Sequence, residues 1–168
     1  MKILKSFKFA IKGIIYTLRN ERNMRIHTMV SACVFILSLF FDLSTEKYLI
    51  LFLTVALVMV AEVINTSIES LIDVYSKNYN STAKMAKDVA AGAVLIASGF
   101  AVFIGVILFH DINAYIKICK FLCLYPFAFL LLIAFAVFAY FYIFLGPAEI
   151  KNKAKKFIKN MLGVNFKK

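Results

Sequence analysis

Charged residues are scarce in this sequence of 168 residues, and acidic residues are the scarcer kind. Only 17% of the residues are charged and 62% are hydrophobic, whereas in a soluble domain about a quarter are charged and about half are apolar. With a mean hydropathy of +0.84, little of the chain is left for a large soluble catalytic domain. The composition therefore indicates an integral membrane protein.

Cysteine, histidine and glycine are also few, and their positions exclude several kinds of site. Cys33, Cys119 and Cys123 lie in or beside apolar segments without a CxxC pair or a histidine nearby, so the sequence indicates neither a zinc site nor a disulfide framework. None of the six glycines is followed by Lys-Ser or Lys-Thr, which excludes the common phosphate-binding loop. No nucleophilic triad is evident, and we interpret His27 as an interfacial hydrogen-bonding residue.

Long apolar runs predict four membrane-spanning helices, each near the roughly 20 residues that a span requires. The first run is short, and we expect it to continue the helix before it. The predicted spans are Ile26 to Phe41, Tyr48 to Ile72, Lys87 to Phe109 and Phe121 to Leu145.

Residues 1–25 have the pattern of an amphipathic surface helix. At 100° per residue the apolar residues of this segment share one stripe, and four basic residues cluster beside it. The apolar stripe is Ile3, Phe7, Ile11, Ile14 and Leu18, and the basic cluster is Lys5, Lys8, Lys12 and Arg19. We expect this helix to lie in the membrane interface, with its lysines among anionic head groups.

The basic residues predict the topology. Seven of the 20 precede the first span, three (Lys77, Lys84 and Lys87) lie in the loop Asp73 to Asp88, and seven follow Glu149. By the positive-inside rule, both termini and the middle loop are expected in the cytoplasm. Because the positive charge lies next to the spans, we do not expect a nucleic-acid partner.

Five of the nine acidic residues are expected to converge at the cytoplasmic ends of the spans. They are Glu21, Glu62, Glu69, Asp73 and Asp88. Spacings of three, four and four place Glu62, Asn65, Glu69 and Asp73 on one stripe of a helix. Several carboxylates without matching arginines favour a divalent cation, and Mg²⁺ is commonly held by one or two carboxylates plus substrate phosphates.

Two other interpretations of these acids stay open at this point. A carboxylate inside a span costs at least about 2.5 kcal/mol on insertion scales, so Glu62 needs a partner, a proton or a function. It could be a protonated packing residue, or the proton-coupled ligand of a small four-span transporter. The transporter leaves the Lys87-Asp88 pair unexplained, and a non-enzymatic scaffold bound through its basic ends leaves Glu62 unexplained.

Residues 5 to 109 resemble the small prokaryotic diacylglycerol kinases, whose Gram-positive branch consists largely of undecaprenol kinases. The basic surface helix and three strings of sequence carry the resemblance. These strings are Asn20-Glu21-Arg22-Asn23-Met24-Arg25-Ile26-His27, Glu62-Val63-Ile64-Asn65-Thr66-Ser67-Ile68-Glu69 followed by Asp73, and Ala86-Lys87-Asp88-Val89-Ala90-Ala91-Gly92-Ala93-Val94-Leu95.

The resemblance implies an ATP-dependent kinase that phosphorylates a membrane lipid alcohol in the bacterial plasma membrane. It also implies a homotrimer with three spans per subunit, in which neighbouring subunits share the active sites. Undecaprenol is the expected substrate, because Arg25-Ile26-His27 is similar to the undecaprenol kinase branch. The alternative substrate is diacylglycerol, which would give phosphatidic acid.

Residue roles also follow from the resemblance. Glu62 corresponds to the general base, and Glu21 and Glu69 to the Mg²⁺ ligands. Arg25 and Glu62 are expected to contact the lipid substrate. The residues expected to bind the nucleotide are Glu21, Asn65, Glu69, Asp73, Lys87 and Asp88.

Three regions are expected along the chain. Residues 1–25 form the surface helix, residues 26–110 the transmembrane kinase core, and residues 111–168 an extension. The extension would contain the fourth span and a lysine-rich cytoplasmic tail. We expect its apolar segment to be a membrane anchor or a packing helix.

Overall fold

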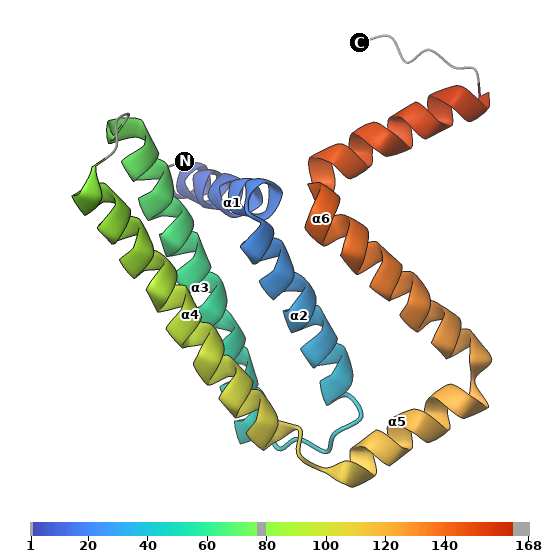
Figure 1. Cartoon of the computed structure of the whole chain (residues 1–168). Helices are drawn as coiled ribbons and strands as arrows, with labels where there is room; N and C mark the ends of the chain where they lie inside the picture. Colours follow the sequence, from blue (N-terminus) through green and yellow to red (C-terminus); the bar gives the residue numbers. More distant parts are fainter. Residues whose placement is uncertain (1, 77–79, 163–168) are drawn as a thin grey trace.

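The computed structural model describes the backbone of residues 2–76 and 80–162 and the side chains of residues 3–76 and 80–147. Every regular element within these ranges is an α-helix (Figure 1). The elements are α1 (Lys2–Asn20), α2 (Arg22–Ser38), α3 (Thr45–Tyr75), α4 (Ser81–Leu108), α5 (Ile112–Leu124) and α6 (Pro126–Leu162). The expected all-helical membrane fold is confirmed.

Helices α3 and α4 form a long antiparallel pair (Figure 1). Their apolar sequences of 31 and 28 residues are long enough to cross a membrane, and so is the segment Pro126–Pro147 of α6. At about 1.5 Å per residue, α3 exceeds the roughly 30 Å hydrocarbon thickness, so its polar end can extend beyond the hydrocarbon. Asn80 is the N-cap of helix α4, and its side chain accepts hydrogen bonds from the Thr82 and Ala83 backbone N–H groups.

The chain breaks between α1 and α2, so the expectation that the first span continues the preceding helix was wrong. Glu21 adopts an extended conformation, with φ −95° and ψ 120°, and Figure 1 shows α1 turned steeply away from α2. The apolar side chains of Ile3 and Phe7 on α1 are 74% and 64% exposed. This exposed apolar face suits the interfacial position predicted for the helix.

Helix α2 also differs from the predicted span at Ile26 to Phe41. It has 17 residues, or about 25 Å, and it ends at Ser38. It is therefore not among the three described helices that are long and apolar enough to cross a membrane. The break at Glu21 prevents α1 and α2 from forming one longer helix, so α2 is short. In addition, the charged residues Arg22 and Arg25 occupy its first turn.

The extension contains two helices where one span was predicted. Residues 121–124 belong to α5. Asp111 is the N-cap of this helix, and its side chain accepts a hydrogen bond from the Asn113 N–H. Pro126 then begins α6, at the helix position where its missing N–H costs least. Helix α6 kinks at Gly146 and continues to Leu162 (Figure 1). The side chains of the predicted basic tail, Lys151 to Lys168, lie outside the described residues.

A hydrophobic cluster joins the ends of α2, α3, α4 and α5. Phe41 is 5% exposed, and its ring packs edge-on against Phe109 and Tyr115, with centroids 5.0 and 5.3 Å away. Leu51 and Leu108 are buried in the same cluster. These contacts hold together the end of the bundle opposite to Glu62, Glu69 and Asp73 of α3.

Phe41→Ala is expected to lower the free energy of unfolding by about 3 to 5 kcal/mol, because it leaves a cavity among these rings. Unfolding in mixed detergent micelles, followed by circular dichroism, measures the change. The matched control is Leu39→Ala, since Leu39 is 77% exposed. Equal effects of the two substitutions would show that Phe41 does not anchor the cluster.

Candidate active site

The polar stripe predicted for α3 is present, and its innermost residue is a buried carboxylate. The Glu62 side chain is 1% exposed, and within the part of the chain that the structure describes its Oε2 atom has no hydrogen-bond partner. The neighbouring Thr66 hydroxyl donates to the Glu62 backbone carbonyl, at 2.9 Å, and not to the carboxylate. Glu62 therefore keeps an acceptor atom available inside the protein.

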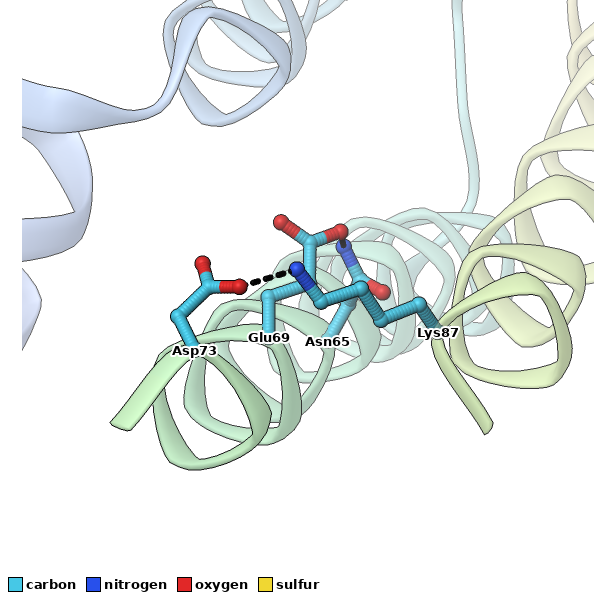
Figure 2. Close-up of polar contacts among 4 residues, drawn as sticks. All are labelled: Asn65, Glu69, Asp73 and Lys87. Carbon is cyan, nitrogen blue, oxygen red and sulfur yellow. Dashed lines mark hydrogen bonds and ion pairs between the residues drawn. The ribbon is translucent and has the colours of Figure 1, made fainter. Parts of the chain in front are cut away.

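One turn further along α3, Asn65 and Glu69 are joined directly. The Asn65 Nδ2 atom donates to Glu69 Oε1 at 2.9 Å, as Figure 2 shows. The amide oxygen of Asn65 is buried and has no partner among the described residues. The hydrogen bond fixes the Glu69 carboxylate, while the Asn65 Oδ1 atom remains a second available oxygen.

Asp73 and Lys87 form an ion pair between α3 and α4 (Figure 2). The side chains of Lys87 and Asp73 are 35% and 66% exposed, so the pair lies at the rim of the site. Asp88 is exposed on α4, and none of the described hydrogen bonds or ion pairs joins it to the α3 residues. The structure thus brings Lys87 into contact with the acidic stripe, whereas Asp88, the next residue on α4, makes no described contact with the stripe.

Glu21 reaches the site from the break between α1 and α2. It occupies the N-cap position of α2, but its side chain makes no capping hydrogen bond. The carboxylates of Glu21, Glu62 and Glu69 are close enough to interact electrostatically. Burial raises the pKa of the Glu21 carboxyl above its ordinary value, Glu69 raises it further, and the positive charge of Arg25 partly offsets both effects.

Arg25 lies on α2 one turn after Glu21, and it is 7% exposed. Its Nη1 atom donates to the Arg19 carbonyl at 2.9 Å, and its Nε atom donates to the Ile143 carbonyl at 3.1 Å. Ile143 belongs to α6, so the extension contacts a predicted site residue. Sequence reasoning missed this contact, although the Gly146-Pro147 pair after a long apolar run is a helix-break signal.

The oxygen-rich donor set suits a hard divalent cation bound together with phosphate. Among the described residues, no group of three or more His, Cys, Asp or Glu side chains is arranged to hold a metal ion alone. Two nearby carboxylates, Glu21 and Glu69, match instead the usual pattern of Mg²⁺, which takes one or two carboxylates and completes its shell with water and substrate phosphates. The residues present therefore fit a cation that arrives with a nucleotide.

Comparison with known proteins places this chain in a family. Residues 8–109 match the family described as prokaryotic diacylglycerol kinase. A diacylglycerol kinase from Synechocystis sp. is 40% identical over 104 residues, which cover 61% of this chain and 59% of that protein. An undecaprenol kinase from Bacillus subtilis is 35% identical over 108 residues, covering 64% of this chain and 88% of that protein. A diacylglycerol kinase from Escherichia coli strain K12 is 29% identical over 96 residues, covering 57% and 79%.

The family match includes every acidic residue of the site, from Glu21 to Asp88, and excludes α5 and α6. The acidic residues alone were also compatible with a transporter or a scaffold. The family match favours an enzyme over both. The match covers more than half of the chain, and the chain therefore belongs to the prokaryotic diacylglycerol kinase family of membrane lipid kinases.

Proposed function

We propose that this protein transfers the γ-phosphoryl group of ATP to the hydroxyl group of a membrane lipid, with undecaprenol as the preferred acceptor. The observation that carries the proposal is the buried Glu62 carboxylate, whose Oε2 atom has no partner among the described residues and lies near Glu21 and Glu69. The site combines a candidate base inside the protein with candidate cation ligands nearer the rim. A lipid kinase requires both.

Glu62 acts as the general base in this proposal. It accepts the proton of the lipid hydroxyl as the hydroxyl oxygen attacks the γ-phosphorus. The bond between the γ-phosphorus and the β–γ bridging oxygen then breaks, and ADP leaves. The membrane position of α3 suits this role, because a lipid alcohol presents its hydroxyl near the end of the hydrocarbon region.

Glu21 and Glu69 hold Mg²⁺ together with the ATP phosphates. The bound cation supplies charge neutralisation for the transferred phosphoryl group. Asn65 orients Glu69 through its hydrogen bond of 2.9 Å. Glu69 lies on α3 and Glu21 at the break between α1 and α2, so Glu21 can be placed correctly only if this break keeps its geometry.

The Asp73–Lys87 ion pair is proposed to bind the nucleotide from the aqueous side. Lys87 is a compact positive charge that suits phosphate oxygens. Asp73 holds it over the acidic stripe (Figure 2). We propose that Asp88, exposed beside Lys87, lines the same nucleotide site.

Two observations support a lipid chain next to Glu62. A groove of about 370 Å³ between α2, α3 and α4 has an almost entirely apolar lining, and His27 and Val58 are among its residues. Val58 lies one turn before Glu62 on α3. A hydrocarbon chain in this groove would place its polar end near the proposed base. Arg25 is not in the groove lining, because its guanidinium bonds to the Arg19 and Ile143 carbonyls, and its contact with the lipid stays a prediction.

The acceptor could be undecaprenol or diacylglycerol, and each has its own support. The Bacillus subtilis undecaprenol kinase aligns over 88% of its length, and the Arg25-Ile26-His27 form is similar to that branch. The diacylglycerol kinase of Synechocystis sp. has the higher identity, 40%. We propose undecaprenol first and diacylglycerol as the second candidate.

We also propose a homotrimer in the bacterial plasma membrane, with both termini in the cytoplasm. The orientation rests on the excess of basic residues at the ends of the helices where the acidic site lies. The assembly is supported by an apolar hollow of about 580 Å³ on the α3–α4 pair, with Ile64, Ile68 and Val89 in its lining. Such a surface can bury residues of a second copy or contact lipid.

Incubation of the purified protein with labelled ATP, Mg²⁺ and a panel of lipids tests the proposed activity. We expect label in the extracted lipid, and more of it with undecaprenol than with diacylglycerol or ceramide at equal mole fractions. Preferential labelling of diacylglycerol would move the assignment to the second candidate. A panel without any labelled lipid would refute the kinase.

Glu62→Gln is expected to lower the rate of phosphoryl transfer by about 10²- to 10⁴-fold, because the amide cannot accept the proton. Binding of the Mg²⁺ complex of a non-hydrolysable ATP analogue, measured by calorimetry, is expected to persist. Glu46→Gln is the control, since Glu46 is exposed at the opposite end of α3. A Glu62→Gln protein with wild-type turnover would exclude Glu62 as the base.

Glu21→Ala and Glu69→Ala are each expected to raise the Mg²⁺ concentration for half-maximal activity by about tenfold or more, because each removes a carboxylate ligand. Magnesium titrations of the initial rate give this value. Glu46→Ala, which removes an exposed acid elsewhere, should leave the titration unchanged. Curves for both site variants that superimpose on the wild-type curve would remove these residues from the cation site.

A further inference from the structure

Helix α6 carries a backbone break whose residues are suited to it. Gly146 has φ 71° and ψ 160°, a conformation that essentially only glycine adopts. Pro147 follows and has no backbone N–H. In an uninterrupted helix the N–H of residue 147 would donate to the carbonyl of Ile143, so that carbonyl has lost its helical donor.

The Arg25 guanidinium supplies the missing donor. Its Nε atom donates to the Ile143 carbonyl at 3.1 Å, and its Nη1 atom donates to the Arg19 carbonyl in the last turn of α1, at 2.9 Å. Carbonyls at helix C-termini lack intrahelical partners and carry partial negative charge, so both suit a cation. One buried side chain of α2 therefore joins the ends of α1 and of the first segment of α6.

Glu21 lies in the sequence between Arg19, whose carbonyl the guanidinium binds, and Arg25 itself. Its backbone N–H donates to Thr17 of α1 at 2.8 Å, and its carbonyl accepts from the Arg25 N–H at 3.3 Å. Its side chain makes no capping hydrogen bond that would fix it locally. The position of the Glu21 carboxylate thus depends on how α1 and α2 meet, and Arg25 holds that junction against α6.

We propose that the extension is part of the catalytic assembly, because the Ile143 carbonyl exposed by Gly146 and Pro147 holds Arg25 and thereby positions Glu21. The inference rests on the proposed function, in which Glu21 is a cation ligand. It replaces the expectation that the extension is a membrane anchor or packing helix only. Ile143, Gly146 and Pro147 lie outside the matched residues 8–109, so the arrangement belongs to this chain's own extension.

Gly146→Ala in the full-length protein tests the proposal. A Cβ atom at residue 146 is strained at this φ, and it would lie 3.4 Å from the Arg25 guanidinium carbon and Nη1. We expect the concentration of the Mg²⁺–ATP complex for half-maximal rate to rise about tenfold, the effect of losing one hydrogen bond to a charged group. We expect the maximal rate at saturation to change much less.

Gly99→Ala is the matched control, because a Cβ atom there has no atom within 4 Å and the helix is regular. Unfolding midpoints in detergent confirm that the variants are folded. Calorimetric binding of the Mg²⁺ complex of a non-hydrolysable ATP analogue gives a readout that does not depend on turnover. It should weaken in Gly146→Ala and stay unchanged in Gly99→Ala.

A double-mutant cycle that combines Gly146→Ala with Arg25→Lys shows whether the two residues act through the same contact or independently of each other. Lysine keeps the charge but loses the Nε and Nη1 donors, so the double variant should be no worse than the more impaired single variant. If Gly146→Ala does not fold, Pro147→Ala takes its place, because its restored N–H competes with Arg25 for the Ile143 carbonyl. Additive effects, or unchanged binding in the folded α6 variant, would overturn the proposal. Wild-type protein without kinase activity would instead refute the proposed function.

Discussion

The burial of the Glu62 carboxylate in a membrane-spanning helix is the constraint on which the site depends. A carboxylate in the hydrocarbon region costs at least about 2.5 kcal/mol, and an unsatisfied buried acceptor adds to this cost. The Glu62 side chain is nevertheless 1% exposed, and its Oε2 atom has no partner among the described residues. The surrounding polar groups, Asn65 and Thr66, bond elsewhere, so they leave this oxygen available for the substrate proton of the proposed reaction.

A second constraint comes from helix ends. The break at Glu21 is needed to direct an acid from the α1–α2 junction toward α3, but it leaves carbonyls of α1 without helical donors. Arg25 satisfies one of them and, in the same geometry, the Ile143 carbonyl that Pro147 leaves unpaired. Two interruptions far apart in the sequence are thus compensated by one guanidinium, whose planar set of donors can reach two acceptors.

Much of the architecture could be predicted from composition and periodicity. The runs that became α3 and α4, and most of the apolar part of α6, are recognisable because about 20 consecutive apolar residues are rare outside membranes. The errors occurred where a short polar interruption decides the outcome. Glu21 separates α1 from α2, and Pro126 separates α5 from α6 within one apolar run. Hydropathy averaged over a window of residues does not detect such breaks.

The sequence by itself determined the membrane class, the helical stripe from Glu62 to Asp73 and the family, because these depend on residue type and on spacing within one helix. Only the tertiary structure decided which groups from different helices meet. It brought Lys87 of α4 to Asp73, Glu21 to the α3 carboxylates, and Arg25 to the carbonyl of Ile143, 118 positions along the chain. The physical reason is that backbone carbonyls are alike in every residue, so their availability depends on where a helix breaks and on which side chain packs against the break.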